Sequence, residues 1–130
     1  MTIAATVDTF DEVVREGHVL VDIWGPECQP CLRLMPAVEA LGEKFEGRIR
    51  LITVNAPENR KVCRDLRVAG LPAYLTMRDG VEVERLTSAD TTPEQIEQAI
   101  VRLLNGGPAV GPPVPQHLRG TAAAQRPEGR

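Results

Sequence analysis

Two cysteines separated by two residues are the groups in this chain best suited to chemistry. Cys28 and Cys31 lie in the stretch Trp24-Gly-Pro-Glu-Cys-Gln-Pro-Cys31, where an apolar run gives way to an amphipathic segment. The attacking form of cysteine is the thiolate, and the unpaired N–H groups at a helix start favour that charge. Cys31 follows one helical turn later, near enough to close a small disulfide. The pair therefore predicts thiol–disulfide exchange, in which Cys28 attacks and Cys31 releases the mixed disulfide.

Zinc binding is the alternative chemistry for such a pair. A structural zinc site takes four Cys or His ligands, and the chain offers only Cys63, His18 and His117 besides the pair. His117 falls in a segment rich in proline and glycine, and Pro30 lacks a backbone N–H that could support a bound sulfur. We therefore predict no metal and no cofactor.

Composition limits the class of protein. A chain of 130 residues with 42% hydrophobic residues has room for one domain with a core. No run approaches the ~18 apolar residues of a membrane helix, and a net charge of −3 argues against nucleic acid as a partner. Residues 1–8 show no basic segment leading into an apolar stretch, so we predict a cytoplasmic location. We also predict a monomer without membrane contact.

The hydrophobic pattern predicts alternating helices and strands, with a further strand possible before residue 8. The predicted helices are 8–16, 28–46, 58–66 and one starting at a Thr92 cap; the predicted strands are 19–24, 49–54, 73–77 and 81–86, the last two forming a hairpin. This order implies an α/β fold: a three-layer sandwich whose central mixed sheet has helices on both faces.

The composition changes at residue 106. Ten of the last 25 residues are Gly or Pro and none is aromatic, so this segment cannot bury enough apolar surface to offset its ordering entropy. We predict a folded domain over residues 1–105 and a disordered tail over 106–130. The alternative is that Gly111-Pro-Pro-Val-Pro115 serves as a polyproline docking strip.

Several separated motifs resemble one known family. The pattern Asp22-x-Trp24-x-x-x-Cys28-x-Pro30-Cys31, followed by Pro36, resembles the active-site segment of the thioredoxin family. Gly70-Leu-Pro72 resembles that family's cis-proline loop, and Arg78-Asp-Gly80 falls at its usual hairpin. The resemblance covers about residues 3–104, and it implies a thioredoxin-like fold.

The resemblance also implies roles for single residues. Cys28 would be the nucleophile and Cys31 the resolving thiol, with Asp22 passing protons to and from Cys31. Burial of a lone carboxylate on a strand raises its pKa, which suits this role, although Asp22 could instead cap or pair with a neighbour. Trp24, Leu71 and a cis Pro72 would border the substrate. The implied partners are client proteins with disulfides and a thioredoxin reductase or another thiol donor.

Four positions depart from the family pattern. Glu27 replaces a usual tryptophan, Gln29 a glycine, and Ser88 a glycine that borders the substrate groove; Thr53 replaces a basic residue expected near Asp22. These changes predict an altered docking surface and a reducing to intermediate potential. They also leave open a rival interpretation, a binding module that acts as an adaptor or chaperone accessory with little redox turnover.

The segment 58–66 holds the third cysteine. Cys63 stands between Val62 and Leu66, so we interpret it as a small core residue rather than a regulatory thiol. Four nearby cations form a basic face, which is either solvated or a dock for an acidic partner: Arg60, Lys61, Arg64 and Arg67.

Overall fold

A five-stranded sheet forms the centre of the protein. The computed structural model describes residues 2–106, and the strand order is β1-β3-β2-β4-β5. The strands are β1 Thr2–Ala5, β2 His18–Trp24, β3 Arg50–Asn55, β4 Ala73–Arg78 and β5 Val81–Leu86. The helices are α1 Phe10–Val13, α2 Gln29–Lys44, α3 Arg60–Leu66 and α4 Pro93–Leu104, with a 3₁₀ turn, η1, at Ala56–Glu58.

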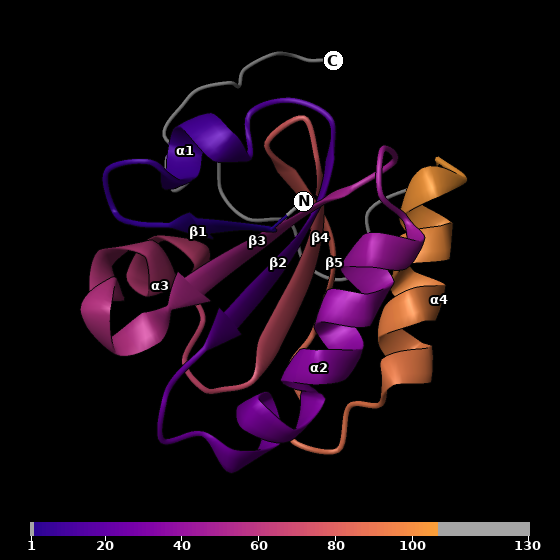
Figure 1. The fold of residues 1–130 in the computed structure, drawn as a ribbon. Coiled ribbons are helices and arrows are strands. Elements are labelled where there is room, and N and C mark those ends of the chain that lie inside the picture. The colour runs from indigo at the N-terminus through magenta and orange to yellow at the C-terminus, as the bar shows by residue number, and fades with distance from the viewer. Residues whose placement is uncertain (1, 107–130) are drawn as a thin grey trace.

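The sheet is mixed, as the sequence predicts. Strands β1, β3 and β2 run parallel, whereas β4 pairs antiparallel with both β2 and β5. Helices α1 and α3 cover one face of the sheet and α2 and α4 cover the other (Figure 1). The predicted three-layer α/β sandwich is therefore confirmed.

Two apolar clusters fill the spaces between the layers, and β2 contributes to both. Val19, Val21 and Ile23 join the cluster under α1 and α3. Leu20 points to the opposite face and packs with Val38 of α2. This alternation is the two-residue period of a strand, and it assigns Asp22 to the face covered by α2 and α4.

Three predicted helices are shorter in the structure, and the one predicted at 28–46 differs least, spanning Gln29–Lys44. The helix predicted at 8–16 is the four-residue α1. It begins only at Phe10 because Thr6 and Thr9 form its entry turn, in which the Thr6 N–H donates to Thr9 Oγ1 at 3.0 Å. The helix predicted from residue 58 begins at Arg60, since residues 56–58 form the 3₁₀ turn η1.

The predicted turn chemistry near the end of the domain is confirmed. Thr92 and Gln95 form a capping box at the start of α4, and Asp79 and Gly80 turn the β4–β5 hairpin with φ values of 52° and 82°. The tail predicted over 106–130 lies, apart from Gly106, outside the described residues, so the domain boundary stays a prediction. Within residues 2–106 no helix has the length and apolarity to cross a bilayer.

Candidate functional site

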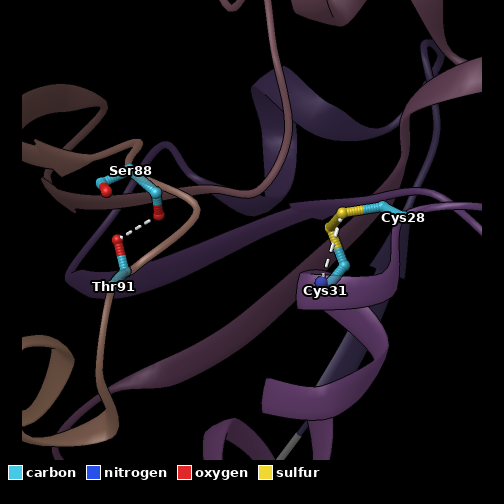
Figure 2. Close-up of a disulfide and its surroundings, with 4 residues drawn as sticks. All are labelled: Cys28, Cys31, Ser88 and Thr91. Carbon is cyan, nitrogen blue, oxygen red and sulfur yellow. Dashed lines mark hydrogen bonds between the residues drawn. A yellow bond between two sulfur atoms is a disulfide. The ribbon is translucent and has the colours of Figure 1, made fainter.

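Cys28 and Cys31 form a disulfide at the start of α2. Their Cα atoms are 5.2 Å apart, within the usual range for a disulfide. Cys28 is the N-cap of the helix, and its Sγ accepts a hydrogen bond of 3.2 Å from the Cys31 N–H, drawn in Figure 2. In the reduced protein, an N–H in this position stabilises a thiolate on Cys28.

The two cysteines differ in their access to solvent. Cys31 is 1% exposed, whereas Cys28 is half-buried. A disulfide of another molecule can therefore approach the sulfur of Cys28 more readily than that of Cys31. This difference suits a pair in which one thiol attacks and the other acts afterwards.

Asp22 is a buried carboxylate on the face of the sheet that α2 covers. It is 2% exposed, and its Oδ1 is a buried atom without a hydrogen-bond partner. Burial, and to a lesser degree the negative charge of Glu39 on α2, raises the pKa of Asp22 to about 7. A carboxyl group with that pKa takes up and gives up protons near neutral pH.

The strand register identifies the neighbours of Asp22. Thr53 is its partner on β3 and Tyr74 its partner on β4. The family resemblance predicts that Thr53 lies near Asp22, at the place of a basic residue. The register does place Thr53 directly opposite Asp22. No cation therefore stands opposite the carboxylate in either strand pair.

The peptide bond between Leu71 and Pro72 is cis, as the resemblance implies. Pro72 is buried, and Leu71 is half-buried. A Cβ added to Gly25 would lie 3.1 Å from Leu71 Cδ1, so the side chain of Leu71 packs against the loop that leads to Cys28. This contact brings the segment before β4 to the disulfide end of β2.

The connection between β5 and α4 lies at the same end of the sheet (Figures 1 and 2). Ser88 is exposed there, and its carbonyl accepts a hydrogen bond of 2.6 Å from the Thr91 hydroxyl. The Ser88 hydroxyl accepts a hydrogen bond of 3.0 Å from the Asp90 N–H. The carbonyl and the hydroxyl of Ser88 are therefore both hydrogen-bonded within the loop. Trp24 ends β2 opposite Asn55 and is half-buried.

Comparison with known proteins identifies the family. The sequence profile of thioredoxin matches residues 1–102, which include every residue of the site described above. The chain belongs to the thioredoxin family. With its Cys28–Cys31 pair, this thioredoxin-family chain is a thiol–disulfide oxidoreductase.

Three curated thioredoxins illustrate the similarity. The thioredoxin of Peptoclostridium acidaminophilum is 37% identical over 87 residues, which are 67% of this chain and 79% of that protein. The Bacillus subtilis thioredoxin is 30% identical over 99 residues, 76% of this chain and 93% of that protein. Thioredoxin 1 of a Nostoc species is 32% identical over 93 residues, with coverages of 68% and 87%.

Two neighbours of Asp22 escape sequence analysis. Glu39 lies 17 positions further along the chain, and Tyr74 is 52 positions away. Only the register and the packing of α2 bring them to the carboxylate. The one signal for Tyr74 in this thioredoxin-family sequence is a phenol in an otherwise apolar stretch, Ala73-Tyr-Leu75.

The third cysteine lies outside this site. Cys63 is free and half-buried, and it packs against the cluster under α1 and α3. Burial raises the pKa of its thiol, which lowers its reactivity. The four predicted basic-face residues are exposed, and Lys61 pairs with Asp65 at 2.8 Å. Among residues 2–106, no three His, Cys, Asp or Glu side chains cluster as metal ligands would.

Proposed function

We propose that this chain reduces protein disulfides, with Cys28 as the nucleophile and Cys31 as the resolving thiol. The observation that carries the proposal is the position of Cys28 at the N-cap of α2, where its sulfur accepts the Cys31 N–H. The low exposure of Cys31 supports the order of the two steps, because a shielded thiol reacts with a neighbouring sulfur rather than with a second substrate.

The reaction balances as two exchanges. The Cys28 thiolate attacks one sulfur of the client disulfide, forms a mixed disulfide and expels the other client sulfur as a thiolate. The Cys31 thiol then loses its proton and attacks the Cys28 sulfur, so that the Cys28–Cys31 disulfide forms and the second client sulfur leaves. Two electrons pass from the protein dithiol to the client, and the two client thiolates take up protons.

Asp22 is the proposed proton carrier for the second exchange. Its carboxylate accepts the proton of Cys31, directly or through water, and returns it to the departing thiolate. The raised pKa of about 7 supports this role, because the carboxyl group can then work in both directions at neutral pH. Structural ion pairs also shift pKa values, and Asp22 has no such partner on its strand neighbours Thr53 and Tyr74.

The client surface is proposed to consist of Trp24, Leu71 and Pro72. The cis peptide before Pro72 leaves adjacent backbone groups free to pair with an extended client segment. Glu27 and Gln29 are exposed beside the disulfide, so clients meet a different surface from the one that the usual family residues provide.

The proposed electron donor is a thioredoxin reductase or another thiol donor. We further propose that the chain works in the cytoplasm, because a dithiol reductase needs a reducing supply of electrons. We also propose that it works as a monomer. Neither nucleic acid nor a membrane is among the proposed partners.

The test is a disulfide-reduction assay with a protein client and a small dithiol as electron donor. Wild type is compared with Cys28→Ser, and Cys63→Ser serves as the matched control for loss of a thiol outside the site. We expect Cys28→Ser to lower the rate to that of the donor alone and Cys63→Ser to retain the wild-type rate. Equal rates for wild type and Cys28→Ser would support the adaptor interpretation instead.

A further inference from the structure

Two unpartnered polar atoms belong to residues that are directly opposite each other in the sheet. Within residues 2–106, the buried side-chain atoms without a hydrogen-bond partner are Asp22 Oδ1, Asn55 Oδ1 and the Tyr74 hydroxyl. Asp22 and Tyr74 are cross-strand partners in the antiparallel β2–β4 pair, where facing Cβ atoms are about 4.5–5.5 Å apart. Each residue is only 2% exposed, so bulk solvent does not reach either side chain.

The two groups are chemically complementary. Burial and, secondarily, the negative charge of Asp22 raise the pKa of Tyr74, so its hydroxyl remains protonated at neutral pH. A phenol that keeps its proton is a hydrogen-bond donor, and an ionised carboxylate is the strongest acceptor among side chains. An unpaired donor and an unpaired acceptor, both buried on one face, each cost free energy that a shared hydrogen bond recovers.

The other groups around Asp22 do not offer the same partner. Glu39 on α2 is an acid and raises the pKa of Asp22, and Cys31 on α2 is in the disulfide. Thr53 on β3 also carries a hydroxyl that can donate, but it is half-buried and its hydroxyl is not among the buried atoms without a hydrogen-bond partner. On α4, Glu97 pairs with Lys44 and Arg102 with Glu84, while Glu94 is exposed.

We propose that Tyr74 is a positioning residue for Asp22, and that its hydroxyl donates a hydrogen bond to a single bridging water, which in turn donates to the ionised Asp22 carboxylate. The inference rests on the proposed role of Asp22 as the proton carrier for Cys31. A hydrogen bond to the charged form favours that form. Tyr74 therefore opposes burial and Glu39, and it keeps a fraction of Asp22 ionised at neutral pH.

The direct test is the titration of Asp22 in the oxidised full chain, followed by the ¹³C NMR signal of its carboxyl group. The signal is assigned with Asp22→Asn. Tyr74→Phe removes only the hydroxyl, and we expect it to raise the pKa of Asp22 by about one unit, the effect of losing one charge-assisted hydrogen bond. Thr53→Val is the matched control from the opposite strand, and it should move the midpoint much less.

Two results would overturn the proposal. One is an unchanged Asp22 midpoint in Tyr74→Phe, and the other is an equal or larger shift in Thr53→Val. Thermal unfolding of both variants checks that the fold is intact. We expect it to be intact in Tyr74→Phe, because this change keeps the aromatic ring and removes only the hydroxyl.

Turnover gives a second, independent readout. In a single turnover with a small aromatic disulfide, the release of the second thiol in Tyr74→Phe should show a pH profile moved upward by the same amount as the Asp22 midpoint, and match wild type above both midpoints. In an Asp22→Asn background, Tyr74→Phe should leave the rate unchanged, and a persisting effect would refute action through Asp22. If Asp22→Asn alone turns over as fast as wild type, the proton-carrier role fails while the titration still decides the pair.

Discussion

The two faces of the central sheet bury different chemistry. Under α1 and α3, the buried cluster consists of apolar side chains, among them Val21, Ile23 and Leu75. Under α2 and α4, the same strands turn Asp22 and the Tyr74 hydroxyl inward along with Leu20. One face is a plain hydrophobic core, and the other combines a core with buried polar atoms that have no partner.

The difference shows where stability and reactivity come from in this fold. An apolar cluster contributes to folding at every pH, since none of its members changes charge. A buried carboxyl group costs stability once it ionises, and that cost is tolerated where the ionisation is useful. The disulfide lies at the start of α2, one of the two helices that cover the polar face (Figure 1).

The largest stability effect is expected on the apolar face. Leu75 is fully buried in β4, so Leu75→Ala should lower the free energy of unfolding by about 2 to 5 kcal/mol at all pH values. Denaturant unfolding measures this loss, and the reduction rate per folded molecule should stay at the wild-type level. Val101→Ala, on an exposed position of α4, is the control and should cost well under ~1 kcal/mol. A large loss of activity in folded Leu75→Ala would mean that the two faces are not separable.

A smaller effect with a pH dependence is expected on the polar face. The pKa of Asp22 is raised from 3.8 to about 7 by folding, so the folded state binds the proton more tightly than the unfolded state between these values. The free energy of unfolding of the oxidised protein should therefore fall as the pH rises from 4 to 7, by about 2 to 4 kcal/mol. In Asp22→Asn this part of the pH dependence should vanish.

Denaturant unfolding of wild type and Asp22→Asn across pH 4 to 8 measures the difference. Other titrating groups are common to both proteins, so only the difference between the two curves reports on Asp22. Curves that stay parallel over this range would contradict a raised pKa for Asp22 and would remove the contrast between the faces.

Much of this architecture was predictable because local rules agree with the fold. The position of the cysteine pair at a strand–helix junction follows from the apolar run before Cys28 and the amphipathic segment after it. The α4 start follows from a capping box that needs only Thr92 and Gln95. The family resemblance placed Thr53 near Asp22, and the strand register pairs the two residues.

The rest depended on contacts that sequence spacing does not encode. The late start of α1 results from threonine hydrogen bonds at its entry, which form a turn in place of the first helical residues. The pairing of Asp22 with Tyr74 depends on the register between strands far apart in the chain, and the effect of Glu39 depends on how α2 lies over the sheet. The cysteine pair was therefore predictable from the sequence, whereas the residues that we propose to tune Asp22 were not.

The central claim is that Cys28 attacks and Cys31 resolves, and one trapping measurement tests it most directly. Reduced Cys31→Ser is mixed with a protein disulfide, and the products are mapped by mass spectrometry under non-reducing conditions. The account predicts a stable mixed disulfide at Cys28, and no such adduct with Cys28→Ser, although Cys63 is present in both. An adduct at Cys63, or an adduct at Cys31 when Cys28→Ser is used, would contradict it.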